Sequence, residues 1–343
     1  GISHEMGLGE GENAMGKVTA ALRRLGFDKV FDTDFGADLT IMEEATELLG
    51  RIQNGGVLPM FTSCSPGWVK YLEHHFPEMI PNMSTCKSPM EMEGAIIKTY
   101  YAQKAGIDPS SIVVVAVMPC TSKKFEAQRP EMEVNGLRAV DISLTTRELA
   151  RMIHDARIDF VRLPDEECFD ELVAQSTGAA PIFGATGGVM EAALRTAVEK
   201  LSGEELKSLD FTEVRGAEGI KEASYTVNGM EIKVCVVSGL ANANTIMEKV
   251  KNGTADYHFI EIMGCPGGCV NGGGQPLQPA SVRNTVDLRA LRAAVLYKAD
   301  ANMDLRKSHE NSAVKKIYDE YLEHPGSHRA HEILHTSYVK RGL

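Results

Sequence analysis

The sequence has little of what membranes and nucleic acids require. No apolar run approaches the roughly 20 residues that span a bilayer, and no signal-peptide pattern opens the chain. Asp and Glu outnumber Lys and Arg 47 to 36, which gives a formal net charge of −11. This excess of negative charge argues against nucleic acid or an anionic membrane surface as a partner. We therefore expect a cytoplasmic globular protein, long enough at 343 residues for a full hydrophobic core.

The chain also lacks the dense cysteine spacing of a disulfide scaffold. In a cytosolic protein, scattered cysteines are more often ligands, catalytic groups or small buried residues. The paired spacing of zinc fingers and the CxxCxxC spacing of ferredoxin-like clusters are absent. We therefore expect no zinc finger and no accessory electron-transfer cluster. The seven cysteines are Cys64, Cys86, Cys120, Cys168, Cys235, Cys265 and Cys269.

Apolar runs that alternate with amphipathic stretches predict an α/β fold. Residues 111–120 (SIVVVAVMPC) form an unbroken apolar run, typical of a strand buried on both faces of a parallel sheet. Residues 38–54 predict a helix, and residues 181–201 predict a strand, a turn and a helix. Asn228–Gly229 predicts the type I′ turn of a β-hairpin.

We expect two lobes, each built on a mainly parallel twisted sheet flanked by helices. The predicted segments are residues 1–130, residues 131–285 and a helical C-terminal stretch over residues 286–343. Cys64, Cys120 and Cys265 each lie at or just beyond the end of a predicted strand. Ligands of open α/β sheets gather at the carboxyl ends of strands. The long separations between these cysteines favour a metal cluster in the cleft between the lobes.

The strongest local signal is EIMGCPGGCVNGGGQP at residues 261–276. Cys265 and Cys269 are four positions apart and are separated by Pro-Gly-Gly. Thiolates bind iron or zinc, and glycine lets the backbone wrap closely around a metal centre and donate N–H groups to sulfur. A glycine-rich loop with two incidental cysteines is the alternative.

Charged residues give two weaker signals. In MPCTSKKFEA, Lys123 follows Cys120 by three positions and either binds an anionic ligand or only solvates the loop. Glu44, Glu47 and Arg51 share one face of a predicted helix. A solvated charged face is the commoner interpretation of such a run. The functional interpretation is a carboxylate relay that passes protons between solvent and a buried centre.

Two familiar patterns are given no role. HEILH, His331 to His335, matches the HExxH pattern of zinc metalloproteases, but it leaves no room for a downstream third ligand. GATGG at residues 184–188 resembles a phosphate-binding turn but is neither GxGxxG nor a P-loop. The cysteines without a partner motif are interpreted as structural or incidental: Cys86, Cys168 and Cys235.

Three stretches in this order, TSCSPGW, MPCTSKKFE and EIMGCPGGCVNGGGQP, resemble the signatures of the catalytic domain of iron-iron (FeFe) hydrogenases of the clostridial and NAD(P)-linked types. The resemblance also covers FGATGGVMEAALR, RKSHEN and AHEILH. It implies reversible conversion of two protons and two electrons into H2 at an H-cluster. This cofactor is a 4Fe–4S cluster bridged by a cysteine to a two-iron subcluster with CO, cyanide and an azadithiolate bridge. The implied partners are maturation proteins and a ferredoxin-like or associated iron–sulfur electron donor.

The resemblance also implies roles for single residues. Cys120 and Cys265 would be cluster ligands, Cys269 would bridge the cluster to the two-iron unit, and Lys123 would hydrogen-bond a cyanide. The residues implied to line the cofactor pocket are Pro89, Met118, Pro119, Phe183, Met263 and Gly268. The implied proton path consists of Arg51, Glu47, Ser84, Glu44 and the thiol of Cys64.

The first motif departs from the family pattern, which usually has two adjacent cysteines. The first of these carries protons and the second is a cluster ligand, but here the second position holds Ser65. By register, Ser65 takes the ligand position and Cys64 carries protons. Alternatively the loop shifts, Cys64 binds the cluster, and Ser65 is left as a poorer proton carrier.

A rival hypothesis from another functional class is a non-enzymatic iron–sulfur sensor or assembly protein on the same fold. Relatives of that kind keep the cluster cysteines but lack the two-iron unit. The presence of Cys64, Lys123 and Cys269, together with the glutamates of the implied proton path, favours the enzyme.

Overall fold

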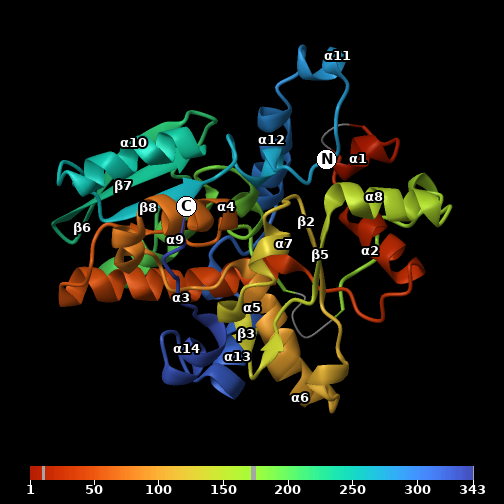
Figure 1. Ribbon diagram of the computed structural model, residues 1–343, viewed down its shortest axis with the longest axis horizontal. Coiled ribbons are helices and arrows are strands. Elements are labelled where there is room, and N and C mark those ends of the chain that lie inside the picture. Colours follow the sequence, from red (N-terminus) through yellow and green to blue (C-terminus); the bar gives the residue numbers. More distant parts are fainter. Residues whose placement is uncertain (10–11, 171–174, 343) are drawn as a thin grey trace.

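The structure is a computed structural model that describes residues 1–9, 12–170 and 175–342. It is an α/β molecule in which parallel strands are flanked by helices (Figure 1). The larger sheet has the strand order β1 (Met60–Phe61), β8 (Phe259–Met263), β7 (Met230–Ser238) and β6 (Ile220–Val227). β8 pairs in parallel with β1 and with β7, and β6 pairs antiparallel with β7. Asn228 and Gly229, with φ of 49° and 78°, confirm the predicted type I′ turn of this hairpin.

Two smaller sheets complete the strands of the described residues. β2 (Val115–Met118) pairs in parallel with β5 (Ile142–Thr145), and β3 (Glu133–Val134) forms a short hairpin with β4 (Leu137–Arg138). The predicted burial of residues 111–120 on both faces is wrong, because every residue of β2 is only half-buried. A pair of two strands offers no central position, so its apolar run remains partly uncovered.

Two of the three sheets take strands from both sides of the predicted boundary at residue 130. In the larger sheet, β1 precedes that residue and β8 follows it, and in the smaller parallel pair β2 precedes it and β5 follows it. These two sheets are therefore not confined to the predicted segments 1–130 and 131–285.

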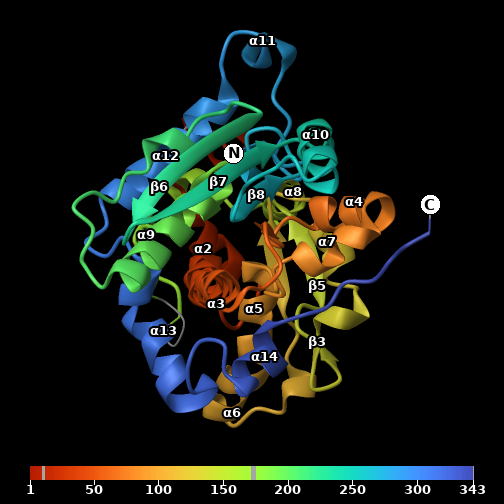
Figure 2. The same ribbon diagram turned by 90° about the vertical axis from the view of Figure 1, so that its left-hand side faces the viewer.

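Helices cover both faces of the larger sheet. Figure 2 shows α9 and α10 on opposite sides of β6, β7 and β8. Successive side chains of a strand point to opposite faces, so Phe259 packs with α3 and α9, whereas Ile260 packs with α4 and α10. These four helices are α3 (Thr33–Asn54), α4 (Pro66–His75), α9 (Gly188–Ser202) and α10 (Leu240–Lys251).

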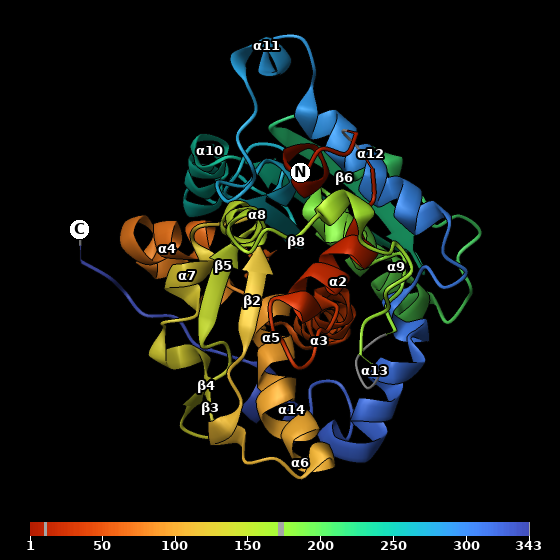
Figure 3. The same cartoon turned by 90° about the vertical axis from the view of Figure 1, so that its right-hand side faces the viewer.

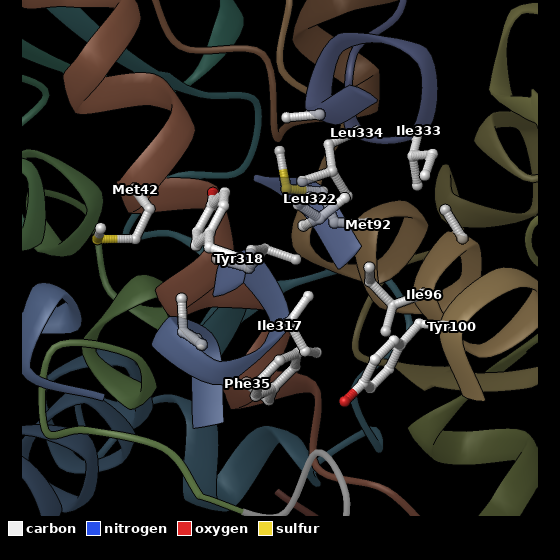
Figure 4. Packing of buried hydrophobic residues seen from close by; sticks show 14 of the residues in the cluster. Phe35, Met42, Met92, Ile96, Tyr100, Ile317, Tyr318, Leu322, Ile333 and Leu334 are labelled. Carbon is white, nitrogen blue, oxygen red and sulfur yellow. The ribbon is translucent and has the colours of Figure 1, made fainter. Parts of the chain in front are cut away.

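A further core joins α3 to α5 and to the C-terminal helices. Figure 4 shows Phe35 of α3, Ile96 of α5 and Ile317 of α13 packed in this cluster. The C-terminal stretch therefore packs against the N-terminal half of the chain. Further α-helices are α1 (Ile2–Glu5), α2 (Met15–Arg24), α5 (Pro89–Ile96), α6 (Ala102–Ala105), α7 (Lys123–Glu126), α8 (Thr146–Asp155), α11 (Ala280–Arg283), α12 (Leu288–Ala301), α13 (Ser312–Ile317) and α14 (His328–Leu334).

Two predicted elements differ from the structure. Helix α3 begins five residues earlier than the predicted helix over residues 38–54, because the Asp32 side chain caps it by accepting the Asp34 N–H at 3.2 Å. The strand predicted at the start of residues 181–201 is instead the 3₁₀ turn Pro181–Gly184. Its proline lacks an N–H for a strand ladder but suits the first position of a helical turn.

Buried carboxylic acids gather where α3 meets α5. Burial raises the pKa of Glu93 to about 8, and the nearby Asp32 carboxyl raises it further. Burial likewise raises the pKa of Asp32 to about 6. The folded protein therefore holds protons near neutral pH that an unfolded chain would release.

This excess of bound protons predicts that stability falls as pH rises. The stability held by neutral Glu93 is complete below the ordinary pKa and is lost as the pH passes its folded pKa of about 8. Glu93→Gln stays neutral at every pH, so we expect its thermal midpoint to fall less steeply than that of the wild type between about pH 5 and about pH 9. Scanning calorimetry checks this, with Glu204→Gln at an exposed position as the control. An unchanged slope in Glu93→Gln would contradict the assignment.

Candidate metal-cluster site

The glycine-rich cysteine loop leaves β8 and packs against the loop that follows β2 (Figure 3). The Gly274 N–H donates to the Pro119 carbonyl at 3.0 Å. A Cβ on Gly272 would lie 2.0 Å from the same carbonyl oxygen, and a Cβ on Gly274 would lie 2.7 Å from the Cys120 nitrogen. Any side chain at these two glycines would therefore push the two cysteine loops apart.

A third loop closes on the same place. A Cβ on Gly268 would stand 2.8 Å from the Gly184 carbonyl oxygen and 2.7 Å from the Thr186 nitrogen. Gly268 itself has φ 96°, which favours glycine. The turn that carries Phe183 thus lies directly beside the loop between Cys265 and Cys269.

The cysteines that converge there are Cys120, Cys265 and Cys269. All three are half-buried, and none forms a disulfide. Burial raises the pKa of Cys269 to about 12; the charge of nearby Cys120 raises it further and that of Lys123 lowers it. Burial also raises the pKa of Cys265, again with Cys120 as a neighbour. Since they form no group of three ligand atoms within 4.8 Å, at least two of their sulfurs lie farther apart. A single tetrahedral ion with bonds of about 2.3 Å needs closer sulfurs, so this spacing favours a larger centre.

The two residues of the first motif face different neighbours. The Ser65 hydroxyl accepts the Gly264 N–H at 3.1 Å, next to Cys265. Burial, followed by the Glu44 charge, raises the pKa of the Cys64 thiol well above its ordinary value. Ser65 therefore faces the cysteine loop, while Cys64 has Glu44 as a titrating neighbour.

Lys123, the first residue of α7, is buried and donates from Nζ to the Cys64 carbonyl at 3.2 Å. It also forms an ion pair with Glu126 Oε2 at 2.6 Å. Burial lowers the pKa of Lys123, but the charge and hydrogen bond of Glu126, together with the charges of Cys120 and Cys64, outweigh burial and the net pKa is raised. The ammonium is therefore held charged inside the site. Sequence reasoning missed Glu126, although its i+3 spacing from Lys123 was a usable signal.

Helix α3 carries a connected polar line from the surface inward. Arg51 donates to Glu47 Oε1 at 2.7 Å, and Ser84 Oγ donates to Glu47 Oε2 at 3.0 Å. The Ser84 hydroxyl is also a neighbour of the buried Glu44 carboxyl and lowers its pKa. Burial, followed by the Glu47 charge, raises the pKa of Glu44 to about 8. One Glu44 oxygen has no hydrogen-bond partner in the described part of the chain, so it can accept a further proton donor.

The remaining predicted pocket residues occupy element ends. Met118 ends β2, Met263 ends β8 and Pro89 begins α5, whose Glu91 carboxyl faces Lys123. Pro119 directly follows β2. Met118, Pro119, Met263 and Pro89 therefore lie at the ends of the elements that lead into the site. Their roles as pocket residues stay predictions.

The GATGG turn binds a carboxylate of the chain itself. Glu261, in the middle of β8, accepts the Gly187 N–H at 2.6 Å and the Met190 N–H at 2.7 Å. Glu261 thus occupies the N-terminus of α9, where a phosphate would otherwise bind. Sequence reasoning missed this role, although a glutamate inside an apolar strand was a signal.

The two histidines of HEILH stack on each other with ring centroids 3.9 Å apart. His335 Nε2 contacts Glu43 Oε2 at 2.9 Å, and His335 Nδ1 contacts Thr85 Oγ1 at 2.7 Å. No group of three ligands within 4.8 Å among the described residues contains His331. The pattern therefore does not form a zincin site.

Comparisons with known proteins identify the family of the chain. Residues 1–273 match the family "Iron only hydrogenase large subunit, C-terminal domain", and residues 286–341 match "Iron hydrogenase small subunit". The chain is 51% identical to Iron hydrogenase 1 of Clostridium pasteurianum, over 99% of this chain and 59% of that protein. It therefore spans about three-fifths of that relative's length.

Two further likenesses cover nearly the whole chain. A structure of the apo [FeFe]-hydrogenase HydA1 variant from Chlamydomonas reinhardtii superposes with a TM-score of 0.86 at 43% identity, covering 100% of this chain and 92% of that one. The cytosolic Fe-S cluster assembly factor narfl of Danio rerio is 31% identical over 98% of this chain and 83% of that protein. Among the described helices, none is long and apolar enough to cross a membrane. The chain belongs to the family of the iron-only hydrogenase large subunit, C-terminal domain.

Proposed function

We propose that this chain is the catalytic domain of an FeFe hydrogenase that interconverts H2 with two protons and two electrons at an H-cluster. The observation that carries the proposal is the polar line from Arg51 to Glu44, which leads to a buried thiol beside Cys269. A buried metal centre that consumes protons needs such a line, because protons move only between groups about one hydrogen bond apart.

The cysteine loops fit the cofactor. Free thiols converge at a spacing too wide for one tetrahedral ion. The glycines let the loops pack so closely that no side chain would fit at their positions. Cys120, Cys265 and Ser65 would hold the 4Fe–4S cluster, and Cys269 would also bridge to the two-iron unit. When bound, the H-cluster supplies the redox chemistry that joins protons and electrons into H2.

The chain's own residues move the protons. The Glu47 carboxylate, held in place by the Arg51 guanidinium, takes up a proton near the surface, and Ser84 Oγ passes it between the two glutamates. With a pKa of about 8, the Glu44 carboxyl is protonated at neutral pH and is ready to donate. Cys64 Sγ, whose raised pKa keeps the thiol protonated, is the last carrier. Lys123 supplies a buried positive charge toward an anionic ligand.

Two further features belong to this proposal. A ferredoxin-like or associated iron–sulfur protein would deliver electrons in the cytoplasm, and dedicated maturation proteins would build the two-iron unit.

The second candidate function is a non-enzymatic assembly role, which the likeness to the narfl assembly factor favours. The thiol of Cys64 and its titrating neighbour Glu44 favour the enzyme.

Infrared spectroscopy of the chain produced together with the maturation proteins tests the proposal. We expect CO and cyanide vibrations, iron in excess of one 4Fe–4S cluster, and H2 production from a reduced low-potential donor. A protein that holds only a 4Fe–4S cluster after complete maturation would support the assembly role. Loaded protein with those vibrations but without H2 turnover would refute the hydrogenase proposal.

A further inference from the structure

Three chemically different metal-ligating side chains meet at the outer end of the polar line. A carboxylate oxygen of Glu47, the sulfur of Cys86 and an imidazole nitrogen of His335 all lie within 4.8 Å of one another. Cys86 Sγ contacts Glu47 Oε2 at 3.8 Å. Oxygen, sulfur and nitrogen donors of this kind form zinc sites at bond lengths of about 2.0–2.3 Å. The group needs only a small contraction to surround such an ion.

The backbone holds two of these ligands side by side. Cys86 and His335 form an antiparallel bridge. On either side of it, Lys87 N–H donates to the Leu334 carbonyl at 2.8 Å and Thr336 N–H donates to the Thr85 carbonyl at 2.7 Å. The residues are 249 positions apart in the sequence but are fixed as neighbours in the fold. Both are part of a rigid pairing, so a site here would be preorganised.

The histidine is already oriented as a metal ligand. Glu43 Oε2 contacts His335 Nε2 at 2.9 Å, and the same carboxylate accepts the Gly326 N–H at 2.9 Å and the Tyr318 hydroxyl. A neutral His335 that donates from Nε2 to this carboxylate presents a lone pair on Nδ1. A carboxylate behind the imidazole is the usual second-layer arrangement at zinc sites.

The Nδ1 lone pair faces the relay. It now accepts a hydrogen bond from Thr85 Oγ1 at 2.7 Å, and the Thr85 N–H donates to Glu47 Oε2 at 3.0 Å. Burial, followed by the charge of Glu47, raises the pKa of the Cys86 thiol. A divalent cation among these groups would offset both effects and favour the thiolate.

We propose that Glu47, Cys86 and His335 form a binding site for a Zn²⁺-like divalent cation at the surface end of the proton relay. The hydroxyl of Thr85 or a water completes the coordination. The bound cation coordinates the Glu47 carboxylate, which then no longer accepts the hydrogen bond from Ser84. Cation binding at this site therefore inhibits the supply of protons. The binding stands by itself, whereas the effect on turnover rests on the proposed hydrogenase function.

Zinc binding is measured first on protein with its iron–sulfur cluster reconstituted, so that the cysteines of the glycine-rich loop are already occupied. Equilibrium dialysis with Zn²⁺ is expected to show one equivalent that is lost or weakened at least tenfold in Cys86→Ser and in His335→Gln. Glu43→Gln, which removes only the second-layer carboxylate, is expected to weaken binding about 10–100-fold. His154→Gln and Cys168→Ser, which change an exposed histidine and an exposed cysteine outside the group, are the matched controls and should bind as the wild type does.

X-ray absorption at the zinc edge of the wild type provides a measurement that does not depend on any variant folding. A shell with one sulfur and two or more nitrogen or oxygen ligands supports the site. A shell without sulfur, or equal zinc binding by the wild type and Cys86→Ser, overturns it. On matured protein, zinc should slow H2 evolution in the wild type and not in Cys86→Ser. Zinc bound through this sulfur without slower turnover would refute the proton route through Glu47 and leave the metal site in place.

Discussion

Replacing Cys64 with alanine is expected to lower H2 turnover by about 10²–10⁴-fold while the iron content stays that of the wild type. The thiol has both the Glu44 carboxyl and Cys269 as neighbours, and alanine leaves no group there that can hold a proton. Its removal interrupts the relay at its innermost step and leaves the cluster cysteines untouched. H2 evolution from reduced methyl viologen, normalised to iron per chain, checks the expectation.

The neighbouring residue supplies the decisive comparison. Because the Ser65 hydroxyl faces Gly264 beside Cys265, Ser65→Ala should lower the iron content or destabilise the cluster, and Ser65→Cys should retain it. Cys235→Ala removes a thiol buried in another core and should affect neither measurement. If instead Cys64→Ala loses iron and Ser65→Ala loses only turnover, the loop is shifted and Cys64 is the cluster ligand.

Local sequence patterns predicted those parts of the fold that depend on neighbouring residues. The hairpin turn at Asn228–Gly229 follows from two residues that tolerate positive φ. The glycine-rich loop was recognised because a spacing of Cys265 and Cys269 with so many glycines has few structural alternatives. Each of these features is decided within a few residues.

The features that were missed depend on residues far apart in the chain. The half-burial of β2 follows from its position in a two-stranded sheet, which its own apolar run does not reveal. Glu261 occupies the N-terminus of α9 only because β8 runs beneath that helix. Cys86 was interpreted as structural or incidental, and its pairing with His335, 249 positions away, was not predicted. A pattern search over one stretch of sequence has no access to such pairings.

Replacing Arg195 with methionine is expected to destabilise the fold by about 3–5 kcal/mol, the usual cost of breaking a buried ion pair from one side. Arg195 on α9 contacts Glu191 at 2.7 Å and Asp300 of α12 at 2.8 Å, and the three side chains are 0%, 0% and 1% exposed. Methionine fills a similar volume without charge, so Glu191 and Asp300 lose their most buried partner. Arg215 and Arg306 still contact these acids from the partly exposed side, at 2.6 and 2.7 Å, and offset part of the loss.

This network braces the candidate site as well as the fold. Glu261 anchors the N-terminus of α9, and Arg292 of α12 donates to the Val270 carbonyl in the glycine-rich loop at 3.0 Å. Urea unfolding of Arg195→Met should therefore show a much lower midpoint than that of the wild type, with weaker cluster retention before unfolding. Arg289→Met, which breaks the exposed ion pair with Asp287, is the matched control and should cost no more than about 1 kcal/mol. A loss in Arg195→Met no larger than in this control would mean that the outer arginines alone neutralise the buried acids, and that the packing between α9 and α12 does not depend on the charge of Arg195.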